Sequence, residues 1–160
     1  MKRIIISKKE VQRKNIDTLI NNDYIFDIRK QTNIINQIYL NDEFDDKNLI
    51  IKGLKKKLQS YKSQDEKQNR YNKDDFITYN DLVEKIVLSK LKCKYCFIDL
   101  FLMYKTVREP NQWTLDRIDN TIQHTSINTV ICCLKCNIQR GRLNDKKFLF
   151  TKQMRIVKKI

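Results

Sequence analysis

Two stretches of sequence decide how this chain folds: KCKYC at residues 92–96 and CLKCN at residues 133–137. In each stretch two residues separate a pair of cysteines, and this spacing lets a tight turn aim both sulfurs at one ion about 2.3 Å away. Two such pairs supply the four thiolates of a tetrahedral zinc site, which leave no coordination position open for catalysis. The sequence therefore predicts one structural zinc ion on Cys93, Cys96, Cys133 and Cys136.

The fifth cysteine, Cys132, directly precedes one of the predicted ligands. It is an alternative to Cys133, but the two-residue spacing favours Cys133, and Cys132 is expected to be a small buried hydrophobic residue on a strand. An odd number of cysteines in such pairs fits metal binding in a reducing compartment better than a disulfide framework. We therefore expect an intracellular protein, cytoplasmic or nuclear.

The segment between the cysteine pairs, residues 97–132, is longer than the roughly 15–20 residues of a simple zinc ribbon, so it must hold structure of its own. Its middle reads WTLDRIDN at residues 113–120, and the only histidine of the chain, His124, follows. We predict a strand around Asp116, a loop over residues 120–128 and a short strand over residues 129–132. A helix then opens at the second cysteine pair and ends at Gly141, since glycine commonly follows the last residue of a helix.

The order of these features resembles the zinc-containing branch of the HNH, or ββα-metal, endonuclease family. The features are a zinc-binding turn, a strand ending in Asp-X-Ile, a loop, a second strand and Cys-X-X-Cys-Asn. The resemblance covers residues 91–141, about a third of the chain. It rests on the four cysteines together with Asp116, Asn128 and Asn137. It implies an α+β fold in which a zinc-stapled ββα-metal, treble-clef-like module follows a mostly helical N-terminal region.

The resemblance also implies an activity, the metal-dependent hydrolysis of phosphodiester bonds in DNA. In the family one divalent ion lies against the scissile phosphate. Its protein ligands fall here on Asp116 and Asn137, and the residue that holds the loop falls on Asn128. Magnesium or manganese suits such a site, since these hard ions prefer oxygen ligands. The ion would stabilise the charge of the transition state and the leaving oxygen.

The family's general base is a histidine directly after the aspartate, and this chain has Arg117 there. Arginine stays protonated and offers no lone pair, so it can clamp a phosphate but cannot take a proton from water. Three outcomes follow: His124 acts as the base, with Asp119 as an alternative base or outer partner; the metal alone activates water; or hydrolysis is lost. In the last case the alternative function is an HNH-derived zinc module that binds nucleic acid, for instance in a packaging or assembly role.

The charge of the chain indicates the same partner. It carries 33 Lys and Arg against 19 Asp and Glu, a net charge of +14, and an excess of this size favours nucleic acid, with DNA as the first expectation. A basic surface kept for solubility, or docking to an acidic protein or a membrane surface, is the alternative. No apolar run approaches the roughly 20 residues of a membrane span, and the many Lys, Asn and Ile residues are typical of an AT-rich genome such as that of a virus or phage.

The chain divides into a basic, mostly helical region over residues 1–75 and the HNH-like zinc module over residues 76–160. Helices are predicted over about residues 7–22, 25–41 and 46–70, with a soft boundary in the polar segment 62–73. Thr78 and Asp81 predict a capped helix that leads to the first cysteine pair. Residues 97–104 are interpreted as short strand and core, and a last helix is expected around residues 148–156.

The predicted site residues also have plainer interpretations. Asp116 would otherwise pair with Arg117 or Arg140, and Asn137 would cap the helix that it opens. His124 would be an ordinary loop histidine, although a group that titrates near neutral pH is what a general base requires. The arrangement of these side chains in space decides between the two interpretations.

Overall fold

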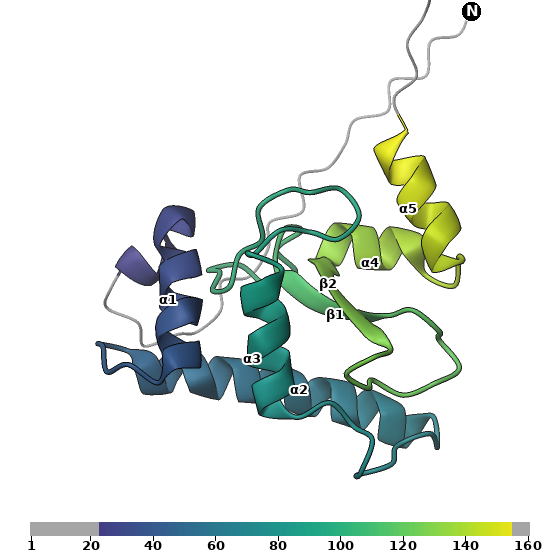
Figure 1. The fold of residues 1–160 in the computed structure, drawn as a ribbon, viewed down its shortest axis with the longest axis horizontal. Helices are drawn as coiled ribbons and strands as arrows, with labels where there is room; N and C mark the ends of the chain where they lie inside the picture. Colours follow the sequence, from purple (N-terminus) through teal and green to yellow (C-terminus); the bar gives the residue numbers. More distant parts are fainter. Residues whose placement is uncertain (1–22, 155–160) are drawn as a thin grey trace, which may run out of the picture.

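The computed structural model describes residues 23–154, and the helix predicted over residues 7–22 lies outside them. The described chain begins with a short 3-10 helix, η1 (Asp23–Phe26), and the helices α1 (Ile28–Leu40), α2 (Lys47–Lys67) and α3 (Tyr79–Leu88). A hairpin of β1 (Trp113–Arg117) and β2 (Thr129–Cys133) follows, and then α4 (Leu134–Arg140) and α5 (Asp145–Gln153) (Figure 1). The predicted α+β class is confirmed.

The hairpin lies between α2 and α4 and positions side chains toward both helices. Its strands are antiparallel, in a register that places Trp113 opposite Cys133. Successive side chains of a strand point to opposite faces. On one face the Trp113 ring lies 4.2 Å from Nζ of Lys57, which belongs to α2, and on the other Asp116 meets Arg140 of α4. The hairpin is therefore covered by a helix on each face.

Two helix boundaries follow local sequence signals, and both predictions are confirmed. The Thr78 hydroxyl accepts a hydrogen bond from the backbone N–H of Asp81, and the Asp81 carboxylate accepts one from the backbone N–H of Thr78, so the capping box fixes the start of α3. Helix α4 ends at Gly141, whose φ of +51° lies in a region that favours glycine. These contacts involve neighbours in sequence, which is why the sequence alone specified them.

Residues 97–104 do not form the predicted strand. Only isolated bridges occur there, Lys92 with Asp99 and Phe101 with Gln112. The physical reason is that the nearby backbone groups close turns around the first cysteine pair, with the Cys93 N–H bonded to the Ile98 carbonyl at 2.9 Å. The last helix also begins earlier than predicted, because Asn144 caps it through the N–H of Lys147.

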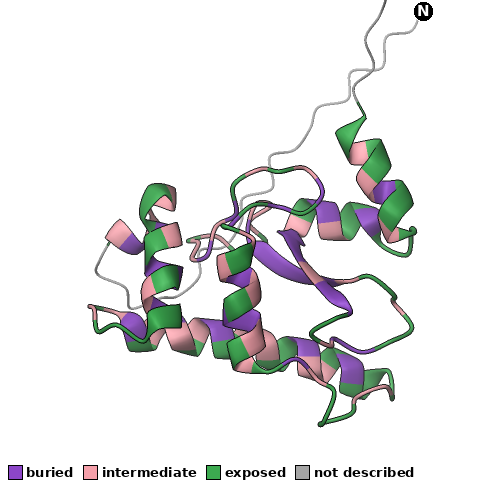
Figure 2. Ribbon diagram, in the orientation of Figure 1, coloured by how far each residue is buried: buried purple, intermediate pink, exposed green. Residues whose placement is uncertain are grey.

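One hydrophobic cluster extends from Ile25 to Phe148, and Figure 2 shows buried residues on the inner sides of α1, α2, α3 and the hairpin. The division at residue 75 stays a prediction about the sequence, and in the structure a contact from α2, which ends at Lys67, joins the two parts. The Tyr61 hydroxyl of α2 accepts a hydrogen bond from the backbone N–H of Leu115 in β1 at 3.0 Å. None of the described helices is long and apolar enough to cross a membrane.

Candidate metal centre and basic cleft

The four predicted zinc ligands converge. The Sγ atoms of Cys93, Cys96, Cys133 and Cys136 all lie within 4.8 Å of one another, and those of Cys96 and Cys133 are 3.9 Å apart. In a tetrahedral site with zinc–sulfur bonds of about 2.3 Å, neighbouring sulfurs are about 3.8 Å apart. The donor set and its spacing therefore fit one metal ion, and zinc is one of the ions that take four thiolates in this geometry.

Backbone hydrogen bonds hold the two cysteine pairs against each other. The N–H of Cys133 donates to Sγ of Cys93 at 3.3 Å, and the N–H of Cys136 donates to Sγ of Cys133 at 3.3 Å. The Lys94 N–H donates to the Ile131 carbonyl at 3.0 Å, which ties the first turn to β2. Since such N–H groups stabilise negative charge on sulfur, the backbone is arranged for thiolates.

The cysteines of the cluster alter one another's acidity. The hydrogen bond with Cys133 lowers the pKa of Cys93 to about 5, whereas burial and the neighbouring charge of Cys93 raise the pKa of Cys136 to about 12. One thiolate thus opposes the ionisation of the next, because like charges at this separation repel. A divalent cation removes that penalty by neutralising the thiolates that coordinate it.

Cys132 does not belong to the cluster, as predicted. It is fully buried on β2, and the Thr114 hydroxyl lies 2.9 Å from its carbonyl oxygen and 3.4 Å from its sulfur. Burial raises the pKa of the Cys132 thiol well above its usual value, with the charge of Asp116 adding to the effect. A neutral thiol of this kind is a hydrophobic packing residue and a poor metal ligand.

Asp116 forms a buried ion pair with Arg140. Nε of Arg140 donates to Oδ2 at 2.5 Å and Nη2 donates to Oδ1 at 2.8 Å, and the hydroxyl of Tyr95 adds a bond to Oδ2 at 2.6 Å. The side chains of Asp116 and Arg140 are 4% and 1% exposed. Of the two plainer interpretations of Asp116, pairing with Arg140 is the one that the structure contains.

Arg140 also ties together the segments around Asp116. Its Nη1 donates to the Leu143 carbonyl at 2.7 Å, and its Nη2 contacts the Arg117 carbonyl and, at 3.4 Å, the side-chain oxygen of Asn120. The guanidinium thereby joins β1, the loop after it and the turn before α5. Such a buried pair is costly to break from one side, since the remaining charge stays in the interior.

Asn137 lies on the same side of β1 as Asp116. Its amide nitrogen donates to the Thr114 hydroxyl at 3.1 Å and to the Leu115 carbonyl at 3.3 Å. Asn137 does not cap α4, because the cap residue is Cys133. Asp116 and Asn137, the two residues predicted to bind a catalytic ion, both line one cleft.

His124 and Arg117 meet at Asp65, a residue of α2 that the sequence analysis did not identify. Oδ2 of Asp65 accepts from Nδ1 of His124 at 2.7 Å and from its backbone N–H at 2.8 Å. Oδ1 lies 2.8 Å from Nε of Arg70 and 3.3 Å from Nη1 of Arg117. Asp65 is fully buried, so one carboxylate inside the protein holds three positively charged or polar partners.

A sequence signal for Asp65 existed. It stands four residues after Tyr61, on the apolar stripe of α2 that includes Ile50 and Leu54. A carboxylate on the buried face of a helix requires partners, because an unpaired buried charge is costly. What the pattern could not show is which partners it has, since His124 is 59 residues away in sequence.

His124 is buried, with 2% of its surface exposed, and its ring lies 4.9 Å from the ring of Tyr61. Burial lowers the pKa of His124 below its ordinary value, and the hydrogen bond to Asp65 opposes this only in part. Burial alone would raise the pKa of Asp65, but the hydrogen bonds from His124 and Arg70 lower it. At neutral pH the pair is therefore a neutral imidazole whose Nδ1–H donates to a carboxylate.

The loop between the strands is fixed from within by Asn128. Its Oδ1 accepts from the backbone N–H of Asp119 at 2.9 Å, and its amide nitrogen donates to the carbonyls of Asp119 and Gln123 at 2.9 and 3.0 Å. The Asp119 carboxylate accepts from the hydroxyl and the N–H of Thr121, and these bonds lower its pKa. Asp119 is thus a turn residue whose low basicity makes it a weak proton acceptor.

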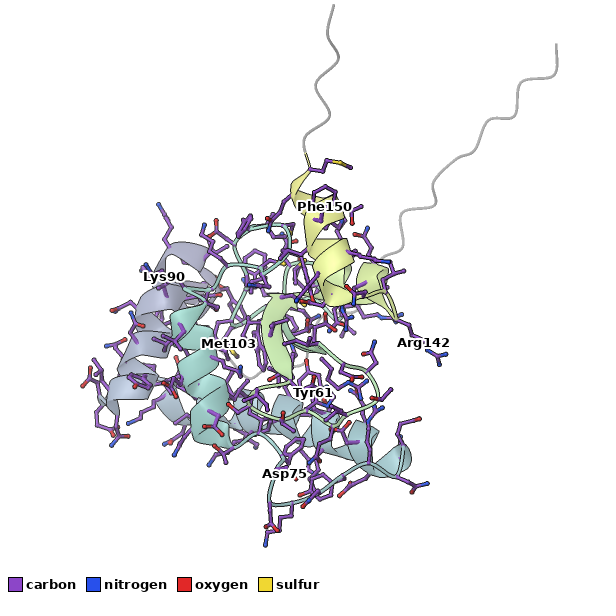
Figure 3. All side chains as sticks on the ribbon, turned by 45° about the vertical axis from the view of Figure 1, so that its right-hand side comes forward. Tyr61, Asp75, Lys90, Met103, Arg142 and Phe150 are labelled. Atoms are coloured by element: carbon purple, nitrogen blue, oxygen red, sulfur yellow. The ribbon has the colours of Figure 1, made fainter. Side chains whose placement is uncertain are left out.

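A cleft of about 1260 Å³ lies along these residues, between α2 on one side and β1, the following loop and the end of α4 on the other. In Figure 3 Tyr61 lies near the hairpin, and Arg142 projects outward at the edge of the molecule. The acidic residues that line the cleft are Asp116 and Asp119, and the basic ones are Lys57, Lys67, Arg70, Arg117, Arg140 and Arg142. Positive charge therefore dominates the walls.

Lys57 also lines the cleft. Its ammonium donates to the side-chain oxygen of Gln112 at 2.8 Å and to the carbonyl of Trp113, and burial lowers its pKa to about 7. Since its donors are used inside the protein, Lys57 joins α2 to β1. The cations that remain for a ligand are Lys67, Arg70, Arg117 and Arg142.

In comparisons with known proteins, no family model, no curated protein and no solved structure matches the chain. The likeness to the HNH family therefore rests on the motif residues quoted from the sequence. What the structure adds is the four-cysteine cluster, the buried Asp116–Arg140 pair and the basic cleft beside them.

Proposed function

We propose that the protein is an HNH-type zinc module, of ββα-metal and treble-clef-like architecture, that binds nucleic acid in its basic cleft. A hairpin followed directly by α4, with one cysteine pair before the hairpin and the other where β2 meets α4, supports the architecture. The zinc ion would fix the first cysteine turn to the start of α4. The module then presents one wall of the cleft, and α2 presents the other.

The charge of the cleft is the observation that carries this proposal. Asp116 and Arg140 neutralise each other in a buried pair, which leaves Asp119 in the cleft and the buried Asp65 against Lys67, Arg70, Arg117 and Arg142. Nucleic acid presents a regular row of phosphates, and each Lys or Arg that neutralises one releases a counterion. An open cleft with this charge suits a phosphate backbone better than a small apolar ligand.

Salt-dependent binding tests the proposal. Purified zinc-loaded protein would be titrated into fluorescent duplex DNA, single-stranded DNA and RNA at several salt concentrations. We expect the logarithm of the binding constant to fall linearly with the logarithm of the salt concentration, with a slope of about −0.9 for each duplex phosphate neutralised. Binding that is absent even at about 10 mM salt would refute the proposal and favour a role in assembly with a protein partner.

A second candidate function is metal-dependent phosphodiester hydrolysis in the same cleft. It is favoured by one observation, that Asp116, Asn137 and His124 all line this cleft. A magnesium or manganese ion would take oxygen ligands from Asp116 and Asn137 and would supply charge stabilisation at the phosphate. Arg117 would clamp the phosphate, and His124 would accept the proton of water through Nε2, since Nδ1 is bound to Asp65.

Two contacts make hydrolysis less well supported than binding. Arg140 and Tyr95 together donate three hydrogen bonds to the Asp116 carboxylate, and a guanidinium next to this carboxylate repels a second cation. His124 is 2% exposed, so the loop that carries it would have to move before water could reach the ring. Binding requires neither change.

Nicking of supercoiled plasmid with Mg²⁺ or Mn²⁺ separates the two functions. If the protein is a nuclease, Asn137→Ala, Asp116→Ala and His124→Ala lose the activity, while Asn36→Ala, an exposed asparagine of α1, keeps it. Asn137→Ala is the most informative variant, because the side chain of Asn137 makes fewer hydrogen bonds than the side chain of Asp116. Nicking that persists unchanged in Asn137→Ala would point to a contaminating nuclease.

A further inference from the structure

We infer that α2 supplies one wall of the nucleic-acid site, and that Arg70 and Arg117, held together by Asp65, form a clamp for one backbone phosphate. This inference rests on the proposed function and adds to Arg117 two residues, Asp65 and Arg70, that the HNH-like motif does not contain. Asp65 and Arg70 lie before residue 75, outside the segment that resembles the family.

The geometry of the clamp comes from a single carboxylate oxygen. Oδ1 of Asp65 lies 2.8 Å from Nε of Arg70 and 3.3 Å from Nη1 of Arg117. Nη1 of Arg70 also donates to the carbonyl of Asn120 at 2.9 Å. The two guanidinium groups therefore converge on the buried Asp65 carboxylate, Arg70 from the segment just after α2 and Arg117 from β1, and both arginines line the cleft and are partly exposed.

The charges around this point do not cancel. Asp65 contributes one negative charge, whereas Arg70 and Arg117 contribute two positive charges, and His124 is neutral at neutral pH. Burial and the nearby charge of Arg70 both lower the pKa of Arg117, which is the response expected of a cation held near another cation. An anion in the cleft would relieve this repulsion.

Both arginines keep donors for such an anion. In the described part of the chain, Arg70 uses Nε and Nη1, and Arg117 uses Nη1, for protein acceptors. The Nη2 group of each arginine, and Nε of Arg117, are left for a ligand. A phosphate oxygen is the acceptor that a guanidinium fork matches best, because two parallel N–H groups meet two oxygens.

A polar stripe continues from the clamp along α2. Ser60, Gln64, Lys67 and Gln68 line the cleft and are exposed, and their spacing of three or four residues places them on one helix face. From Ser60 to Gln68 the stripe is about 12 Å long, which corresponds to about three or four nucleotides of one strand. Hydroxyl, amide and ammonium groups of this kind contact phosphate and sugar, so they position a strand without reading its sequence.

Charge substitution tests the clamp. Arg70→Gln and Arg117→Gln would be compared with Arg29→Gln, an exposed arginine of α1 whose partner is Asp27. We expect each clamp variant to weaken duplex binding about tenfold and to reduce the salt slope by about 0.9, while Arg29→Gln changes neither. Circular dichroism and zinc content would show that each variant is folded.

A second pair of variants avoids the buried network. Gln64→Glu adds a negative charge on the cleft wall, and Gln59→Glu adds the same charge to an exposed position of α2 outside the cleft. We expect Gln64→Glu to weaken binding several-fold more than Gln59→Glu. Wild-type protein that fails to bind nucleic acid would refute the proposed function. Binding by the wild type with unchanged affinity and salt slope in Arg70→Gln, Arg117→Gln and Gln64→Glu would refute the clamp alone.

Discussion

Replacing Asp65 by asparagine removes the one negative charge to which Arg70, Arg117 and His124 bind. The variant keeps the size of the side chain, so no cavity arises, and the effect is electrostatic. The side chain of Asp65 is fully buried, and the side chains of Arg70 and Arg117 are 19% and 15% exposed. Solvent therefore screens these charges only in part.

The expected cost follows from the loss of one partner of a buried ion pair, which destabilises a protein by about 3–5 kcal/mol. Two further effects act in the same direction: an asparagine amide can accept fewer hydrogen bonds than a carboxylate, and two guanidinium groups are left facing each other. We expect the free energy of unfolding to fall by about 3–5 kcal/mol. The loop that carries His124 should also lose its attachment to α2.

Urea unfolding of zinc-loaded protein, followed by circular dichroism, measures this loss. With a denaturant dependence of about 2 kcal/mol per molar urea, the midpoint would fall by about 2 M. The control is Asp42→Asn, which changes an exposed carboxylate after α1 and should shift stability by less than about 0.5 kcal/mol. A loss below about 1 kcal/mol in Asp65→Asn would refute the view that Asp65 holds the cleft together.

Three further outcomes are expected. Zinc analysis should find one ion per chain. The Cys132→Ala variant should keep this ion, whereas Cys133→Ala should lose both the ion and the cooperativity of unfolding, because Cys133 is in the four-sulfur cluster and Cys132 is not. Gly53→Ala should stabilise α2 by about 0.5–1 kcal/mol in the same urea assay, since the added Cβ meets only the side chain of Met103 at 3.8 Å; a destabilised variant would contradict this. The pKa of His124 is lower in the folded chain than in the unfolded chain, so the unfolded chain protonates His124 first as the pH falls. The contribution of His124 to the free energy of unfolding is therefore present above about pH 6.5 and is lost below that value. Unfolding measured between pH 7.5 and 5.5 should show this dependence in the wild type and a weaker one in His124→Gln.

The four clustered cysteines and the helix boundaries could be predicted from the sequence because their determinants are local. The two-residue spacing within each cysteine pair lets both sulfurs bind one ion, and this geometry depends only on the local turn. Thr78 with Asp81 fixed the start of α3 within one turn, and Gly141 fixed the end of α4. The α+β class followed from the same patterns.

The roles of the charged residues at the cleft were decided by tertiary structure. The sequence allowed Asp116 to bind a metal or to pair with either of two arginines, and only the packing of α4 against β1 selected Arg140. It placed His124 in a loop, whereas contact with Asp65 of α2, 59 residues earlier, buried its ring and set its charge. Electrostatic energy depends on distance and on solvent exposure, and for residues far apart in sequence both are fixed only when the chain folds.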